Sequence, residues 1–235
     1  MKRLSFLVTI ILIGLFSTES MAQRDVTTTI RKASGFNAIS VSGGIDLYIT
    51  QGPTESVKIE TAADRQDDII VRVENGTLRI YNDAHFKLNF GRMTLKAHVT
   101  VPTLTHLTAS GGSDIYNYGI LKFDDLKIST SGGSDVKLEL NGARLECRGS
   151  GGADLKLKGK VSFLDAEVSG GSDLIAYDLT AVKVKVRASG GSDAKVSVTS
   201  ELEASANGGA DIYYRGNPSR VNKHSSGGSD ITRKE

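Results

Sequence analysis

The chain contains 235 residues with a formal net charge of +2, and it holds 29 lysines and arginines against 27 aspartates and glutamates. Such a balance gives no electrostatic reason to expect nucleic acid or an anionic membrane surface as a partner. The single cysteine, Cys147, excludes an internal disulfide, so the fold must be stabilised by packing. Because Cys147 alternates with charged residues, we expect it to be a small buried hydrophobe.

The first 22 residues have the pattern of a secretory signal peptide. Residues 1–3 carry positive charge, residues 4–16 form an apolar run, and Ala22 is the small residue that favours cleavage before Gln23. The alternative is an uncleaved membrane anchor, but the apolar run is shorter than the roughly 20 residues that span a bilayer. We therefore expect residues 1–22 to be removed on export across the inner membrane. The mature protein would then work in the periplasm, in the outer membrane or at the cell surface.

Residues 23–235 are predicted to form a single all-β domain, whose N-terminal portion, residues 23–103, is irregular. Alternation of apolar and polar residues through 39–50 predicts a pair of half-buried strands around a Gly-Gly bend. Asn75-Gly76 is the strongest hairpin signal in the chain. Further strands are predicted at 57–60, 69–73, 78–81 and 94–101, with a short helical turn over 62–68 and a loop over 84–92.

Residues 104–235 are organised around a repeated five-residue phrase, typified by Ser169-Gly170-Gly171-Ser172-Asp173 and here named the glycine phrase. With small changes it ends in Asp46, Asp114, Asp135, Asp154, Asp173, Asp193, Asp211 and Asp230. From Asp114 onward, successive aspartates are 21, 19, 19, 20, 18 and 19 residues apart. A period near 19 residues is the signature of a solenoid.

The repeat predicts a parallel β-helix with coils of about 19 residues, each holding two or three short strands separated by bends. In one period, Leu145, Cys147, Gly149, Gly151 and Ala153 share one parity and are predicted to face inward, while the aspartate faces outward. Helical repeats are not expected because the segments are rich in Val, Thr, Ser and Gly. A β-propeller blade would need about 40 residues.

Stacked coils would place the aspartates about 4.8 Å apart, where each neighbouring pair repels by about 0.9 kcal/mol in water. Three explanations for a tolerated ladder are open. Each carboxylate could accept NH groups of its own bend while Lys137, Lys156 and Lys195 neutralise the neighbouring column. Calcium could bind, as it does in β-rolls that repeat G-G-x-G-x-D, although the phrase lacks the third glycine; no other cofactor is expected. The ladder could also recognise a cationic or hydroxyl-rich ligand.

A second column follows two residues after each aspartate. It consists of Tyr48, Tyr116, Lys137, Lys156, Ile175, Lys195, Tyr213 and Thr232. Ordinary cross-strand pairing on an exposed sheet is one interpretation. The other is a flat, partly aromatic face whose tyrosines and lysines contact a glycan or another protein.

No catalytic or metal site is predicted. The acids are distributed evenly by the repeat, and the adjacent pairs Asp67-Asp68 and Asp124-Asp125 are expected to face opposite ways in strands. No phosphate-binding loop, zinc-ligand spacing or nucleophile elbow occurs in the sequence. We therefore expect a protein that is not an enzyme.

The sequence resembles the family of putative auto-transporter adhesins with a head GIN domain, common among secreted proteins of Bacteroidetes-type bacteria. The resemblance is carried by residues 35–47 and Thr50-Gln51-Gly52, by 73–80, and by 101–104 leading into the repeated glycine phrase. The namesake tripeptide reads Gly44-Ile45-Asp46, with Asp in place of Asn. The resemblance implies an all-β, β-helix-like fold and a binding or structural role at the cell envelope. A glycan-active β-helix enzyme and a calcium-stabilised roll are the alternatives.

The sequence stops soon after the eighth glycine phrase, with no recognisable cap. An open solenoid end exposes unpaired strand edges, which are an association hazard. We expect this end to be blunted by the charged residues 233–235 or covered by a second copy of the chain.

Overall fold

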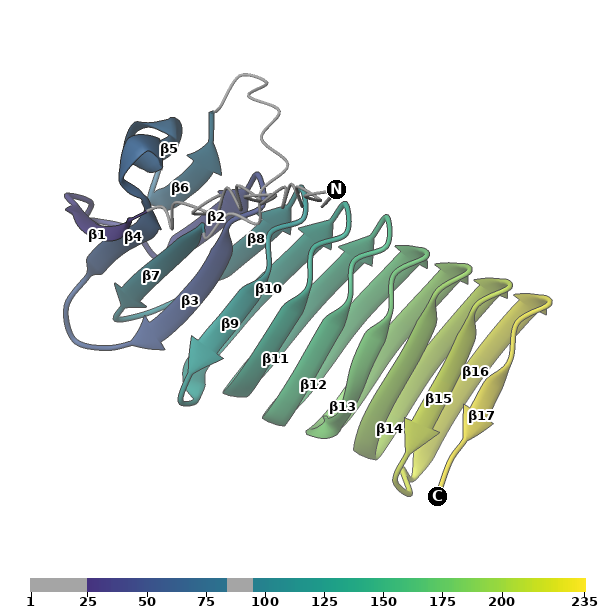
Figure 1. Cartoon of the computed structure of the whole chain (residues 1–235). Helices are drawn as coiled ribbons and strands as arrows, with labels where there is room; N and C mark the ends of the chain where they lie inside the picture. Colours follow the sequence, from purple (N-terminus) through teal and green to yellow (C-terminus); the bar gives the residue numbers. More distant parts are fainter. Residues whose placement is uncertain (1–24, 84–94) are drawn as a thin grey trace, which may run out of the picture.

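The protein is a solenoid of stacked β-coils (Figure 1). It has about seven turns with coils about 19 residues apart, which confirms the predicted fold class. The structure is a computed structural model that describes residues 25–83 and 95–235. The expected signal peptide and the predicted loop over 84–92 lie outside the described residues. No helix among the described residues has the length and apolarity that crossing a membrane requires.

Four middle coils are each one long strand that turns a corner without breaking. These strands are β11 (Val136–Ser150), β12 (Leu155–Gly170), β13 (Leu174–Gly190) and β14 (Asp193–Gly208). The expectation of two or three short strands per coil was wrong for these four coils, whereas the coil before them is divided, as expected, into β9 (Ile115–Tyr118) and β10 (Leu121–Ser131). Between β11 and β12 the parallel ladder continues around the corner opposite the glycine phrase, where Gly142 pairs with Val161 and Arg144 with Phe163. Between β12 and β13 the register shifts just before this corner, between Lys156 and Gly159.

Two sheets face each other across the core. The front sheet contains the half-coils that follow each glycine phrase, such as 136–140 in β11, and the back sheet contains the half-coils that precede it, such as 145–150. Val136, Leu138 and Leu140 are buried from the front sheet, as are Leu145, Cys147 and Gly149 from the back sheet. Cys147 is therefore a buried small residue, as predicted.

The predicted parity continues across the glycine phrase, because Gly149 and Ala153 are both buried. Gly151 was expected inside the core but lies exposed in the bend, since the chain reverses direction there. At the opposite corner the inward-facing positions change from even-numbered residues, ending at Leu140, to odd-numbered residues, beginning at Leu145. The intervening residues 141–144 therefore lie at the surface.

The glycine phrase forms the predicted bend. Its first glycine has a positive φ in every copy, between 64° at Gly111 and 81° at Gly43. The residue before the aspartate is buried, and Ser172, Ser192 and Ser229 at this position hydrogen-bond inside the bend. The Ser192 hydroxyl, for example, lies 2.9 Å from the Ser189 carbonyl oxygen and 3.1 Å from that of Val168 in the preceding coil.

The N-terminal strands do not stack in chain order. They are β1 (Val26–Arg31), β2 (Ala38–Ser42), β3 (Asp46–Gln51), β4 (Ser56–Ala62), β5 (Ile69–Glu74), β6 (Thr77–Asn82), β7 (Lys96–Val101), β8 (His106–Ser110) and β9 (Ile115–Tyr118), with a 3₁₀ turn η1 at Ala63–Asp68. Strand β2 pairs with β6 on one side and β8 on the other, and β3 pairs likewise with β7 and β9. The first coil is thus enclosed between two later segments.

Antiparallel strands cover this end of the solenoid. Strands β5 and β6 form the predicted hairpin, with Asn75 at φ 49° and Gly76 at φ 73°. Strand β4 runs antiparallel between β1 and β7, so the parallel pattern does not continue at this end.

The last coil replaces core residues with charged ones. It consists of β16 (Arg220–Gly227) and β17 (Ile231–Arg233), which follow β15 (Asp211–Arg215). Lys223 pairs in register with buried Ala204, and Arg233 pairs with buried Tyr214, so both charged residues continue inward columns. The Lys223 Nζ atom lies 4.7 Å from the centre of the Tyr214 ring. Charged side chains at inward positions of an edge strand oppose edge-to-edge pairing.

Replacing both Lys223 and Arg233 with leucine should cause concentration-dependent self-association, because the last coil would then present an apolar face. Sedimentation velocity over a range of protein concentrations measures this. Lys156→Leu with Lys160→Leu is the matched control, since both of these lysines are exposed and face away from the core. If the inward pair and the control pair stayed equally monomeric, the inward charges would not protect the edge.

Candidate binding surfaces

The aspartates of the glycine phrases form the predicted ladder along one corner of the solenoid. Asp193 pairs in register with Asp211. After five of the aspartates, the backbone NH of the following residue bonds to the carbonyl of the next coil's aspartate, as Leu47 does to Asp114 at 2.7 Å. Burial, and after it the neighbouring Asp114 charge, raise the pKa of the Asp46 carboxyl, which is the direction that repulsion within the ladder predicts.

Three of the ladder carboxylates bind the next coil, not their own bend. The Asp114 Oδ1 atom accepts the NH of Asp135 at 3.1 Å, Asp173 accepts that of Asp193 at 3.0 Å, and Asp211 accepts that of Asp230 at 2.9 Å. The expectation of bonds within each bend was therefore wrong at these coils, because the aspartate NH points along the solenoid axis toward the preceding coil.

Lysines neutralise this ladder less than expected. Lys137 lies 3.4 Å from the carboxylate of Asp135 in its own coil, whereas Lys156 and Lys195 form no ion pair within the described part of the chain. Tyrosine hydroxyls take this role elsewhere: Tyr116 donates to Asp114 and Tyr213 donates to Asp211.

Chelation of calcium should leave the melting temperature unchanged. Calcium needs six to eight oxygen ligands, and the carboxylates of Asp114, Asp173 and Asp211 already accept backbone NH groups of the adjacent coil. Within the described residues, no group of three or more acidic, histidine or cysteine side chains could hold a metal ion. Differential scanning calorimetry with EDTA and with excess calcium tests this; a melt that moves in either condition would contradict it.

The column after the aspartates is a continuous ladder on the front sheet. Tyr48 pairs with Tyr116, Tyr116 with Lys137, and the pairing continues through Lys156, Ile175, Lys195 and Tyr213 to Thr232. The Tyr48 ring stacks on His98 and Tyr116, each at 5.2 Å, and on Tyr118 at 5.7 Å.

Most ring faces of this column are covered by neighbouring side chains. The Lys137 Nζ atom lies 5.5 Å from the centre of the Tyr116 ring, so neither face of that ring is free. Tyr118 lies beside the column, and among the described residues it is the one tyrosine or phenylalanine that is largely exposed, with 59% of its surface open. Cross-strand pairing therefore explains the column, and contact of its tyrosines and lysines with a ligand stays a prediction.

Tyr116 should ionise well above a normal tyrosine. Burial, then the Asp114 charge and its hydrogen bond, raise the pKa of Tyr116 to about 12. A folded-state pKa above the unfolded value of 10 means that the fold favours the neutral phenol, so this contribution to stability is present below pH 10 and is lost as pH rises through about 12. Asp114→Asn should lower that pKa, as followed by the absorbance of tyrosinate. Asp154→Asn, in a coil without a tyrosine partner, should not.

The adjacent acids and the cysteine occupy different environments. Asp68 forms an ion pair with Arg65 at 2.6 Å. Burial raises the pKa of the Cys147 thiol, which makes a thiolate nucleophile unfavourable. Asp124 and Asp125 were expected to face opposite ways, but both are exposed, because β10 bends there and four residues separate buried Leu121 from buried Leu126.

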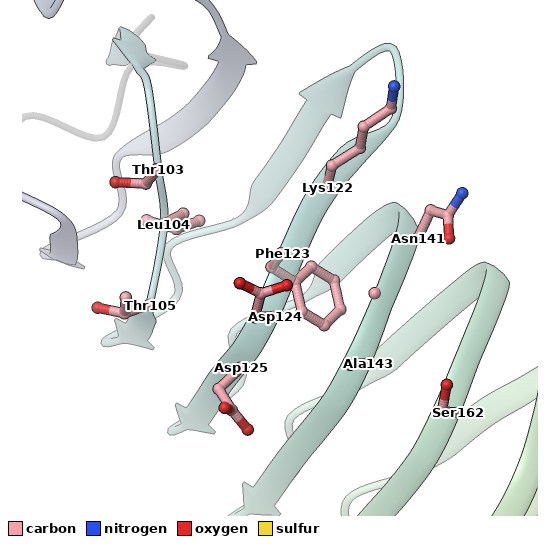
Figure 2. Close-up of a pocket in the computed structure, with 11 residues that line it drawn as sticks. Thr103, Leu104, Thr105, Lys122, Phe123, Asp124, Asp125, Asn141, Ala143 and Ser162 are labelled. Atoms are coloured by element: carbon pink, nitrogen blue, oxygen red, sulfur yellow. The ribbon is translucent and has the colours of Figure 1, made fainter.

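Both of these aspartates line a groove that sequence reasoning missed. Its volume is about 1020 Å³, and Figure 2 shows it between the segment 103–105 and the corners of β10 to β12. The lining residues are Thr103, Leu104, Thr105, Lys122, Phe123, Asp124, Asp125, Asn141, Gly142, Ala143 and Ser162. The available signal was the loss of alternation at this corner, together with an aromatic residue beside two acids.

Gly142 and Gln51 shape the groove. A Cβ atom at Gly142 would overlap the Phe123 ring, so the ring lies directly on the glycine backbone. The Gln51 amide donates to the carbonyl of Pro102 at 3.1 Å and to that of Lys122 at 2.9 Å, and it accepts the NH of Lys122 at 2.8 Å. One side chain thus ties the two walls together.

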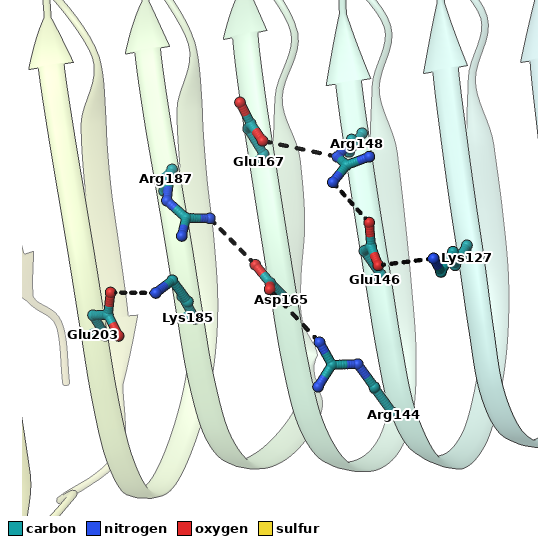
Figure 3. Close-up of polar contacts among 9 residues, drawn as sticks. All are labelled: Lys127, Arg144, Glu146, Arg148, Asp165, Glu167, Lys185, Arg187 and Glu203. Carbon is teal, nitrogen blue, oxygen red and sulfur yellow. Dashed lines mark hydrogen bonds and ion pairs between the residues drawn. The ribbon is translucent and has the colours of Figure 1, made fainter.

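The back sheet carries a network of compensated charges, drawn in Figure 3. Glu146 pairs with Arg148 at 2.9 Å, Asp165 lies between two arginines, and Glu203 pairs with Lys185 at 2.6 Å. Exposed pairs of this kind contribute about 0 to 1 kcal/mol each. Their main consequence is that this face presents few unpaired charges.

Comparison with known proteins places the chain among solved structures of similar fold. A family model described as putative auto-transporter adhesin, head GIN domain, matches residues 35–218. A putative adhesin from Bacteroides fragilis has a TM-score of 0.84 at 26% identity, covering 90% of this chain and 98% of its own. No curated protein matches the sequence.

Two further solved structures share the fold at lower identity. A putative lipid binding protein from Parabacteroides distasonis has a TM-score of 0.71 at 20% identity, covering 89% of this chain and 98% of its own. A putative adhesin from Parabacteroides merdae has a TM-score of 0.70 at 20% identity, covering 91% and 98%.

Proposed function

The chain belongs to the family described as putative auto-transporter adhesins with a head GIN domain, and we propose that it is a secreted, non-enzymatic binding module of the cell envelope. Residues 1–22 support export, because they have the charge, apolar run and small residue of a signal peptide. The family and the related solved adhesin support an envelope setting.

The observation that carries this proposal is how the repeated carboxylates are used. Asp114, Asp173 and Asp211 accept backbone NH groups of the next coil, so the most regular acids of the chain hold the solenoid together. Polar side chains that have no such partners among the described residues gather instead at an open groove. A rigid scaffold that presents a surface site is suited to recognition.

Protease treatment of intact cells tests the location. We expect the chain to lose its antibody signal while a cytoplasmic marker survives, because an adhesin must be exposed at the surface. Survival of the chain in intact cells, with digestion only after the outer membrane is opened, would exclude surface adhesion and leave a periplasmic role.

Incubation of the mature protein with polysaccharides tests the non-enzymatic assignment. Glycoside hydrolysis needs two carboxyl groups held on either side of the bond. We expect no release of reducing ends above a heat-denatured control. Release that disappears in Asp125→Asn would identify a glycan-active enzyme instead.

A further inference from the structure

We propose that the Phe123 groove, lined as in Figure 2, binds a hydroxyl-rich oligosaccharide. This inference rests on the proposed binding function and names the ligand class and the site. It is carried by three observations: an aromatic ring held in place, polar side chains without internal partners, and a mixture of hydrogen-bond donors and acceptors.

The aromatic ring is fixed by its surroundings. Phe123 is partly buried and packs against the hydrophobic core, while its ring lies on the backbone of Gly142. A ring held in this way loses little freedom when a ligand stacks on it. The apolar CH face of a sugar ring is a suitable partner for an aromatic surface of this size.

The polar side chains of the groove have no partners in the described parts of the chain. Neither a hydrogen bond nor an ion pair engages the side chains of Thr103, Lys122, Asp124, Asp125, Asn141 and Ser162 among the described residues. The back-sheet charges drawn in Figure 3 are ion-paired, and within the described part of the chain the change from paired to unpaired acids occurs within a few residues. Asp125 pairs in register with Arg144, yet the Arg144 guanidinium lies 4.7 Å from the Phe163 ring and 3.9 Å from Asp165.

The mixture of these groups selects the ligand. Asp124 and Asp125 only accept hydrogen bonds, Lys122 only donates them, and Asn141 with the hydroxyls of Thr103 and Ser162 does both. A cationic peptide would engage the two carboxylates and be repelled by Lys122. A sugar hydroxyl donates and accepts at once, so an oligosaccharide can satisfy the whole set, with charge-assisted bonds to the carboxylates.

The walls of the groove are joined before any ligand arrives. Gln51 bonds at 2.8 to 3.1 Å to both the Pro102 carbonyl and the Lys122 backbone. A preformed site avoids the ordering cost that weakens binding to mobile loops.

Isothermal titration of the mature protein with cellotetraose, mannotetraose and chitotetraose tests the proposal, with tetralysine as the cationic probe. We expect saturable binding of at least one tetrasaccharide. Asp124→Asn with Asp125→Asn should weaken it at least tenfold without moving the melting temperature, because both carboxylates are exposed and have no ion pair with any residue that the structure describes. Asp178→Asn, an exposed acid outside the groove, is the matched control and should bind as wild type.

Phe123→Leu is a second variant that keeps apolar packing but removes the aromatic face, and it should also weaken binding at least tenfold. The proposal is overturned if no tetrasaccharide saturates, if the groove variants bind like the control, or if only tetralysine binds. If the chain survived protease treatment of intact cells, surface adhesion would be refuted, but the results of these titrations would not change. The failure of the proposed function and the failure of this inference are therefore distinguishable.

Discussion

Replacing Gly159 with alanine should lower the free energy of unfolding by about 2 to 5 kcal/mol, because left-handed strain of about 1 to 2 kcal/mol adds to overpacking of about 1 to 3 kcal/mol. Gly159 has φ 117° and pairs in register with Leu140 in the adjacent coil. A Cβ atom there would overlap the Leu140 carbonyl oxygen, which belongs to the backbone ladder. The clash therefore cannot be relieved by rotating a side chain.

Substitutions at two other glycines of the solenoid distinguish the cost of backbone strain from the cost of a steric clash. Gly152 has φ 85°, but a Cβ atom added there would have no neighbouring atom within 4 Å, so Gly152→Ala should cost only the strain of about 1 to 2 kcal/mol. Gly171 has neither a positive φ nor a neighbour within 4 Å, so Gly171→Ala should be neutral or stabilising by up to about 1 kcal/mol. Urea denaturation followed by circular dichroism measures all three. If all three variants lost the same free energy of unfolding, neither the positive φ nor the close contact at Gly159 would account for the effect of substitution.

Features that repeat along the chain could be predicted from the sequence. The spacing of the aspartates predicts the coil, the Gly-Gly pair predicts the bend, and the common parity of Cys147, Gly149 and Ala153 predicts the core. Each of these features is local and recurs in every coil, so the repeated copies support the same prediction. The two ladders after the bend follow from the same period, since coils of nearly equal length stack in register.

Features that depend on contacts between different coils could not be predicted in this way. The partner of each ladder carboxylate lies one coil away, as for Asp173 and the NH of Asp193. The enclosure of β2 and β3 between later segments breaks the correspondence between chain order and stacking order. The groove depends on Gln51 meeting Lys122, 71 residues further along, and nothing local in the sequence indicates that meeting.

Replacing Leu155 with alanine should lower the free energy of unfolding by about 2 to 5 kcal/mol, because a fully buried leucine would leave a cavity. Leu155 is 0% exposed and lies in an inward column between Val136 and Leu174. Neighbouring coils can relax little, since Leu155 is paired in register with a residue of the coil on each side. Calorimetry and urea denaturation measure the loss; the outward variant Lys156→Ala should stay within about 0.5 kcal/mol of wild type.

A methyl group added at Gly149, in the opposite sheet, should partly fill the cavity that Leu155→Ala leaves. A Cβ atom at Gly149 would lie 2.7 Å from the Leu155 Cδ1 atom, so this glycine leaves room for the leucine across the core. Alone, Gly149→Ala should therefore destabilise by about 1 to 3 kcal/mol through overpacking. When Gly149→Ala is added to the Leu155→Ala variant, the double variant should be as stable as Leu155→Ala alone or more stable. The shortened side chain no longer clashes with the new Cβ atom, and glycine within a strand is itself destabilising. Additive losses in this double-mutant cycle would mean that the two side chains do not share one space, and that the facing sheets of the solenoid pack independently at this point.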